Sequence, residues 1–140
     1  MTIEPKPTIP DWPVASKDGG RGCRLVIIED NALARETLQE LLEFEGYSVA
    51  SEEDGARGMA LILRLRPDFA LVDLNLPGLD GFAIARGVRA AAGGDSICLI
   101  AISGHGDEGS QAQSRAAGFA AHLTKPLDLD RLIALLQARD

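Results

Sequence analysis

The sequence predicts an α/β fold, a (βα)5 domain built on a doubly wound, five-stranded parallel sheet. Short apolar runs alternate five times with segments whose apolar residues recur at helical spacing. The first, third and fourth runs are apolar at every position, which is typical of strands that helices cover on both faces. Parallel strands joined by helices need right-handed crossovers, and these place helices on both sides of the sheet.

Each expected strand is a short apolar run, at 25–28, 47–50, 69–72, 97–102 and 119–123. The first and last helices should pack on the core, because each carries an apolar stripe at spacings of three and four: Ala34, Leu38, Leu41 and Leu42, then Leu129, Leu132, Ile133 and Leu136. A helix over 108–117 is rich in Ser, Gln, Ala and Arg and should bury little apolar area. Helix ends are expected at Gly46, Pro67 and Gly118.

Length and composition fit one domain of 140 residues with 46% hydrophobic content. The formal net charge of -7 argues against binding to nucleic acid or to an anionic membrane. Cys23 and Cys98 have no ligand-like spacing and are expected to be buried thiols in a reducing compartment. No apolar stretch approaches the roughly 18 residues that span a bilayer, so we expect a cytoplasmic protein.

Residues 1–22 contain four prolines and three glycines, and we expect them to form a disordered leader ahead of a domain at 23–140. Trp12 in this leader could dock on the domain or on a partner, or remain exposed.

Polar residues follow the apolar runs at the ends where chemistry is expected. Glu29 and Asp30 end the first strand, and Asp73 ends the third. The fourth ends at Ser103, and Lys125 follows the fifth. Because the carboxyl ends of parallel strands meet at one edge, these groups should converge there.

The three carboxylates would repel one another at that edge, and a bound cation would relieve the repulsion. Oxygen ligands favour Mg²⁺, with Mn²⁺ as a second possibility. Taken singly, each residue has a plainer interpretation: Asp30 as a helix cap, Ser103 as a strand cap, Lys125 as a solvated surface charge.

Four blocks of sequence carry a resemblance to a known family: IIEDN at 27–31, LVDLNLPGLDG at 71–81, AISG at 101–104 and LTKP at 123–126. Together they resemble the receiver domains of two-component response regulators, the CheY-like superfamily, whose fold is flavodoxin-like. The resemblance spans roughly 23–138. It implies a phosphoprotein switch that takes a phosphoryl group from a sensor histidine kinase or a histidine phosphotransfer protein.

The resemblance also implies a role for each matching residue. Asp73 would be the phosphoacceptor, and Lys125 and Ser103 would bind phosphoryl oxygens. Asp30 and Asp73, the backbone carbonyl of Asn75 and, largely through water, Glu29 would hold the metal. The bond from Lys125 to Pro126 would be cis.

Two histidines depart from the commonest pattern of the family. His122 stands where many receivers carry a Tyr or Phe that swings inward when the hydroxyl of Ser103 moves to the phosphoryl group. We expect it to turn inward from solvent, although a surface residue is the alternative. His105 would border the route of the hydrolytic water and, with Asn75, modulate dephosphorylation, or it would be a plain loop residue.

Other functions fit the residues less well. A flavodoxin-like cofactor binder needs a phosphate loop after the first strand, where Glu29 and Asp30 would repel a phosphate. A phosphatase or mutase with an aspartyl nucleophile usually has a second Asp two residues on, where Asn75 stands and cannot transfer a proton. A pseudo-receiver that binds partners without phosphorylation would be expected to lose acids or the lysine.

The expected protein is therefore a switch with no external substrate turnover. It would signal to a downstream protein target, as a stand-alone receiver, a phosphorelay element or a fragment of a hybrid kinase. It would be a monomer or a weak homodimer.

Overall fold

A computed structural model describes residues 23–104 and 110–138 of the chain. The predicted leader, residues 1–22, lies outside these residues. Within the described part, no helix combines the length and apolar character needed to cross a membrane.

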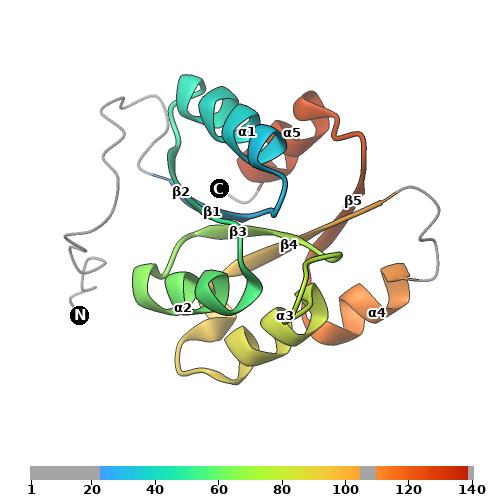
Figure 1. Cartoon of the computed structure of the whole chain (residues 1–140). Coiled ribbons are helices and arrows are strands. Elements are labelled where there is room, and N and C mark those ends of the chain that lie inside the picture. The colour runs from blue at the N-terminus through green and yellow to red at the C-terminus, as the bar shows by residue number, and fades with distance from the viewer. Residues whose placement is uncertain (1–22, 105–109, 139–140) are drawn as a thin grey trace, which may run out of the picture.

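The core of the fold is one sheet of five parallel strands in the order β2-β1-β3-β4-β5 (Figure 1). The strands are β1 (Arg24–Ile28), β2 (Ser48–Glu52), β3 (Phe69–Asp73), β4 (Cys98–Ser103) and β5 (Ala121–Thr124). The three runs that are apolar throughout form β1, β3 and β4, the interior strands, so the prediction of strands covered on both faces is confirmed. The strand order reverses beside β1, which places β1 and β3 next to each other at the centre.

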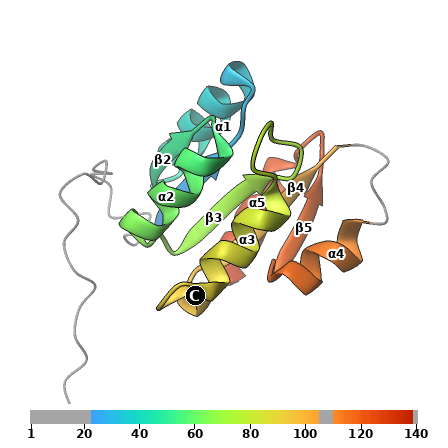
Figure 2. The same ribbon diagram turned by 60° about the horizontal axis from the view of Figure 1, so that its bottom comes forward.

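Helices cover both faces of the sheet, as the (βα)5 prediction requires. In Figure 1, α1 (Ala32–Phe44) and α5 (Leu129–Ala138) lie on one side, and α2 (Gly55–Leu65), α3 (Gly81–Ala90) and α4 (Ser110–Ala117) lie on the other. Figure 2 shows α2, α3 and α4 side by side across their face. A short 3-10 turn, η2 (Gly94–Ser96), leads into β4. Each face has its own apolar core, which the pleat of the strands separates into two clusters.

Three helices begin at residues whose side chains accept a backbone N–H of the first turn. These caps are Asn31 for α1, Asp54 for α2 and Asp80 for α3, with Asn31 Oδ1 accepting from Ala34 N–H at 2.8 Å. A side-chain cap satisfies a donor that the helix itself leaves without a partner. Because Asn31 fills this role, Asp30 is not the cap of α1, and its plainer interpretation is wrong.

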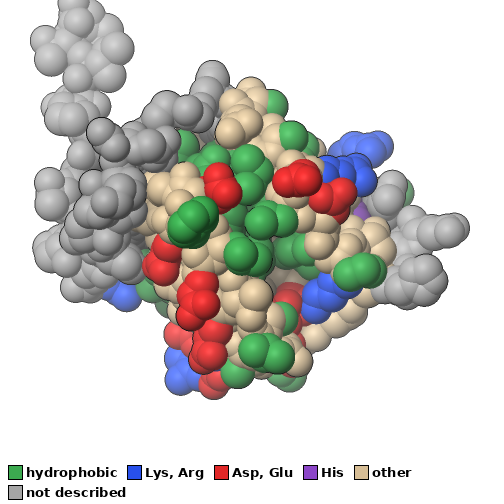
Figure 3. Space-filling view, turned by 90° about the horizontal axis from the view of Figure 1, so that it is seen from above, with side chains coloured by type: hydrophobic (Ala, Val, Ile, Leu, Met, Phe, Trp, Pro, Cys, Tyr) green, Lys and Arg blue, Asp and Glu red, His purple; other side chains and the backbone are tan. Residues whose placement is uncertain are grey.

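The prediction that α1 packs on the core is confirmed through Leu42 and Leu38, but only part of its apolar stripe is buried. Leu42 is fully buried, but Leu41 is 42% exposed and Leu38 is half-buried. Ala34, Leu38 and Leu41 instead line a groove of about 550 Å³ between α1 and the start of α5. Figure 3 looks onto this face and shows hydrophobic side chains gathered at its middle, with acidic side chains around them. By contrast, α5 buries Leu132 and Leu136 as predicted.

Smaller expectations were also corrected. The second and fifth strands begin one and two residues later than their apolar runs, and Phe119 packs in the core ahead of β5 instead of within it. Cys23 and Cys98 form no disulfide, as expected, but they are only partly buried.

Arg89, in the last turn of α3, connects three segments of backbone. Its guanidinium donates to the carbonyls of Gly94 and Ile97, each at 2.7 Å, and to that of Gly118 at 2.6 Å. Gly118 has a φ of +113°, and a Cβ there would lie 2.8 Å from the Arg89 side chain, so a glycine is required at this position. The C-terminal end of α4 is thereby fastened to α3 and to the entrance of β4.

Candidate functional site

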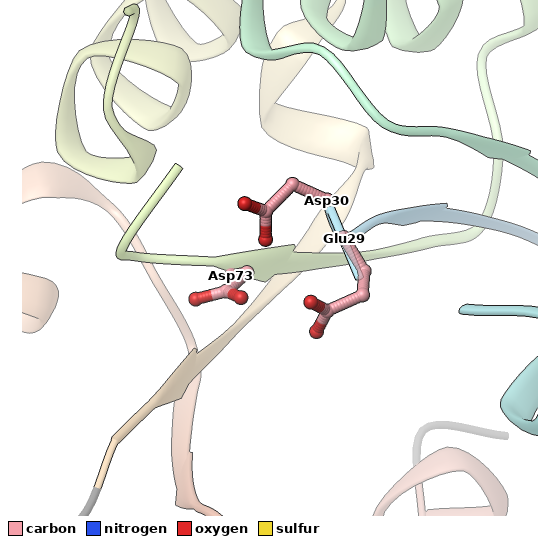
Figure 4. A group of neighbouring side chains, drawn as sticks. All are labelled: Glu29, Asp30 and Asp73. Carbon is pink, nitrogen blue, oxygen red and sulfur yellow. The ribbon is translucent and has the colours of Figure 1, made fainter. Parts of the chain in front are cut away.

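Three carboxylates converge at the carboxyl ends of the two central strands. Asp73 is the last residue of β3, and Glu29 and Asp30 follow β1. One oxygen from each carboxylate lies within 4.8 Å of the other two, and Figure 4 shows the three side chains turned toward a common space. Asp73 and Glu29 are 2% and 6% exposed, whereas Asp30 is exposed. This convergence was predicted from the order of the strands.

Lys125, which follows β5, reaches into this group of acids. Its Nζ lies 2.9 Å from Asp73 Oδ2 and 3.1 Å from Glu29 Oε1. Its backbone N–H donates to the carbonyl of Ser103 at 2.8 Å, which continues the pairing of β5 with β4 and fixes where the side chain starts. Lys125 is therefore an ion-paired group of the site and not merely a solvated surface charge. The bond to Pro126 is cis, the geometry that the resemblance implies.

Backbone N–H groups orient the two buried carboxylates. Asn75 N–H donates to Asp73 Oδ1 at 2.9 Å, and Asn31 N–H donates to Glu29 Oε2 at 3.0 Å. Each of these carboxylates thus receives one bond from the turn that follows its strand and one from Lys125. Such bonds hold a side chain in a single rotamer without any rearrangement when charge develops nearby.

The electrostatics of the site show a shortage of positive charge. Burial raises the pKa of the Glu29 carboxyl above its ordinary value of 4.5, and the charge of Asp73 raises it further, against the opposing effects of Asn31 N–H and Lys125. Burial alone would lower the pKa of the Lys125 ammonium, but its bonds to Asp73 and Glu29 outweigh burial and raise that pKa above 10.5. Lys125 is therefore held in its charged form. The negative charge that it leaves uncompensated favours the binding of a second positive charge in the site.

The residues fit a hard divalent cation. Three carboxylates face one ammonium, the ligand atoms are all oxygens, and one of the three carboxylates is open to solvent. Oxygen donors with open positions for water are the ligands that Mg²⁺ prefers.

Ser103, at the end of β4, is 1% exposed and contacts a histidine. Its Oγ lies 2.7 Å from Nε2 of His122 on β5, and Nδ1 of the same ring lies 2.8 Å from Oγ of Ser114 in α4. The expectation that His122 would start from a solvent-facing position is wrong, because both ring nitrogens are bonded between two buried hydroxyls.

Ser114 was not predicted as a site residue. Its one signal in the sequence is position: it lies three residues before Ala117, on the side of α4 that is buried. Asn75 is exposed beside Asp73, and His105 lies outside the described residues.

Comparisons with known proteins agree with this geometry. The profile of the response regulator receiver domain family matches residues 25–137. Response regulator MprA from Mycobacterium sp. (strain KMS) is 31% identical over 115 residues, which are 82% of this chain and 49% of that protein. The chain thus spans about half the length of the curated relatives it matches.

Two solved structures are also similar. One is the receiver domain of the sensor histidine kinase PA1611 from Pseudomonas aeruginosa PAO1, with a magnesium ion coordinated in its active site cleft. It is 30% identical, with a TM-score of 0.76 over 84% of this chain and 96% of that one. The other is a CheY-like receiver domain protein from Methanospirillum hungatei JF-1. At 24% identity and a TM-score of 0.76, over 84% and 93% of the two chains, it supports the fold alone.

The match covers most of the chain, and the acids, the lysine and the hydroxyl of its four sequence blocks lie together at one edge of the sheet. The chain belongs to the response regulator receiver domain family.

Proposed function

We propose that this receiver domain accepts a phosphoryl group on Asp73 from a phosphohistidine of a sensor histidine kinase or a histidine phosphotransfer protein. One observation carries the proposal: the Asp73 carboxylate lies at the end of the central strand, 2.9 Å from Lys125 Nζ and within 4.8 Å of the Glu29 and Asp30 carboxylates. This arrangement combines a nucleophile with the charges that phosphoryl transfer needs.

In the transfer, a carboxylate oxygen of Asp73 attacks phosphorus. The P–O bond forms as the P–N bond breaks, and the electron pair of that bond goes to the imidazole nitrogen of the donor. Lys125 stands beside the acceptor and balances charge on the phosphoryl oxygens without reorganisation. The hydroxyl of Ser103 donates to one of these oxygens. Attack of water on phosphorus later breaks the P–O bond and restores the carboxylate.

Asp30, Asp73, the carbonyl of Asn75 and, through water, Glu29 would hold Mg²⁺, with Mn²⁺ as a substitute. The metal, when bound, supplies positive charge to the oxygens of the group in transfer. His105 would border the path of the hydrolytic water and, with Asn75, modulate dephosphorylation.

The test is phosphorylation by acetyl phosphate, followed by intact-mass spectrometry. The wild type should gain one phosphoryl group, and Asp73→Asn should gain none. Asp54→Asn is the matched control, because it makes the same change at a helix cap where Asn serves equally well. Phosphate on Asp73→Asn would refute the assignment of the acceptor. A wild type that takes no phosphate would favour the pseudo-receiver alternative.

The apolar groove between α1 and α5 supports a protein as the phosphodonor. It is lined by Leu33 and Leu41 and reaches Glu29 and Lys125, so a partner packed on it would hold its histidine near Asp73. Leu33 is 75% exposed and Leu41 42% exposed, and both line the same groove, so they form the kind of contiguous apolar surface that marks a protein interaction site. Leu33→Ser should slow transfer from a histidine kinase but not from acetyl phosphate. Phe44→Ser, a control on the same helix that is 87% exposed and outside the groove, should leave both rates unchanged.

The proposal includes the consequences of such a switch. The domain would pass its state to a downstream protein target or onward in a phosphorelay, as a stand-alone receiver or as part of a hybrid kinase, with no external substrate turned over. It would act in the cytoplasm as a monomer or weak homodimer. Profiling of transfer from the host's histidine kinases would identify the donor, and light scattering with and without beryllofluoride would test the oligomeric state.

A further inference from the structure

Two serine hydroxyls and one histidine ring form a hydrogen-bonded chain from the site to α4. Ser103 and Ser114 are each 1% exposed, and their Oγ atoms lie 2.7 and 2.8 Å from Nε2 and Nδ1 of His122. Breaking either bond would leave a buried hydroxyl without a partner, at the full desolvation free energy of that group. The folded state therefore strongly favours both bonds. His122 pairs with Ala101 across the strands, which fixes the base of its side chain beside β4.

Counting protons limits the possible arrangements of this chain. A neutral imidazole has one N–H donor and one acceptor nitrogen, and each hydroxyl has one proton to donate. If Nδ1 carries the proton, Ser103 must donate to Nε2 and has no proton for another acceptor. If Nε2 carries the proton, it donates to Ser103 Oγ, and Ser114 must donate to Nδ1. In this second arrangement the proton of Ser103 is available to an oxygen outside the chain.

We propose that Ser114 is a positioning residue for phosphorylation: by donating to Nδ1 of His122, it holds the ring as the Nε2–H tautomer and leaves the Ser103 hydroxyl able to donate to the phosphoryl group on Asp73. The inference rests on the proposed function and extends it to a residue of α4. A phosphoryl oxygen accepts hydrogen bonds and donates none, so of the two neutral tautomers it selects the one with the proton on Nε2. The state of Asp73 is thereby linked to the packing of α4 against β5.

The tautomer can be read directly. In ¹⁵N-detected NMR of the wild type bound to beryllofluoride, the His122 ring should show a protonated Nε2 and an unprotonated Nδ1. A protonated Nδ1 would overturn the proposal, and so would an imidazolium, in which neither nitrogen can accept from Ser114. This measurement needs no variant, so it holds even if substitutions at a buried serine impair folding.

Variants separate positioning from simple packing. Ser114→Ala should reduce the preference for the Nε2–H tautomer and weaken beryllofluoride binding about fivefold, as expected for one lost neutral hydrogen bond. Ser114→Thr, which keeps the hydroxyl, should restore the tautomer. Ser51→Ala is the matched control: it deletes a hydroxyl that donates to Gln39 Oε1 at 2.8 Å on β2, at the far edge of the sheet, and should change neither readout.

The outcomes also separate this inference from the proposed function. If the wild type binds no beryllofluoride, the proposed function fails. If it binds, and Ser114→Ala matches Ser51→Ala in both affinity and tautomer, the role of Ser114 alone is wrong.

Discussion

Replacing Lys125 with Met should destabilise the domain in metal-free buffer and make Mg²⁺ more stabilising than it is in the wild type. The substitution keeps most of the apolar stem and removes an ammonium that lies 2.9 Å from Asp73 and 3.1 Å from Glu29. In the absence of the ammonium, two nearly buried carboxylates face each other without their shared counter-charge.

The magnitude follows from burial. Removing one partner of a buried ion pair costs about 3–5 kcal/mol, and exposed pairs contribute about 0–1 kcal/mol. Counting side-chain atoms alone, Glu29 and Asp73 are 8% and 3% exposed but Lys125 is 39% exposed, which places the ion pair between these limits. Protonation of Glu29 would remove one of the two negative charges, which limits the loss of stability. We therefore expect a loss of about 2–3 kcal/mol, or roughly 10 °C in Tm for a domain of this size.

The assay is thermal unfolding in EDTA and in a Mg²⁺ titration. Because Lys125 and the metal compete for the same oxygens, Mg²⁺ should bind the variant more tightly and raise its Tm by more than that of the wild type. Arg57→Met is the matched control, since it removes a cation from Glu52, Glu53 and Asp54 at the surface, where its side chain is 66% exposed. Equal losses in the two variants, or an equal Mg²⁺ effect in Lys125→Met and wild type, would refute the reasoning.

Three further predictions concern single residues. Asp30→Ala should weaken Mg²⁺ binding and slow phosphorylation while changing the free energy of unfolding in EDTA by less than about 0.5 kcal/mol, because Asn31 caps α1; a larger change in urea titrations would contradict this. Glu29 has a raised pKa, so its stabilising contribution is complete below pH 4.5 and is lost as pH rises through the folded pKa. Glu29→Gln should therefore gain stability over the wild type between pH 4.5 and 7 in EDTA. If the difference in free energy of unfolding between the two does not widen with pH, the prediction is wrong. Arg66 ends α2 with a φ of 52°, so Arg66→Gly should stabilise the domain by about 0.5–1 kcal/mol in denaturant titrations, and a loss of stability would show that its side chain matters more than its backbone.

The fold and the acidic site could be predicted from the sequence because both follow from short local patterns and from the order of the strands. Apolar runs such as 25–28 and 69–72 are short and continuous, and a parallel sheet brings their carboxyl ends to one edge. Glu29, Asp73 and Lys125 thus lie together as a consequence of strand order alone. No knowledge of side-chain packing was needed for this part.

Contacts that depend on how one helix sits against its neighbours could not be predicted in this way. The stripe of α1 has regular spacing, yet Leu41 is open because α5 leaves a groove beside it. The partners of His122 depend on the distance from α4 to β5, and helical periodicity does not report such a distance. From the sequence, Asp30 was considered as the cap of α1, but Asn31 takes this role, and because Asp and Asn cap helices equally well, only backbone geometry distinguishes them.

The bonds from Arg89 to Gly94, Ile97 and Gly118 hold the C-terminal end of α4 in place, so this end is the pivot for any rotation of the helix. Ser114 lies one helical turn from Gly118, about 6 Å along the axis, and the first residue of the helix lies about 12 Å away. A helix that rotates as a rigid rod about Gly118 moves twice as far at its start as at Ser114. A shift of the helix by a fraction of an ångström at Ser114, where it meets the histidine ring, would therefore be doubled at the first residue of α4.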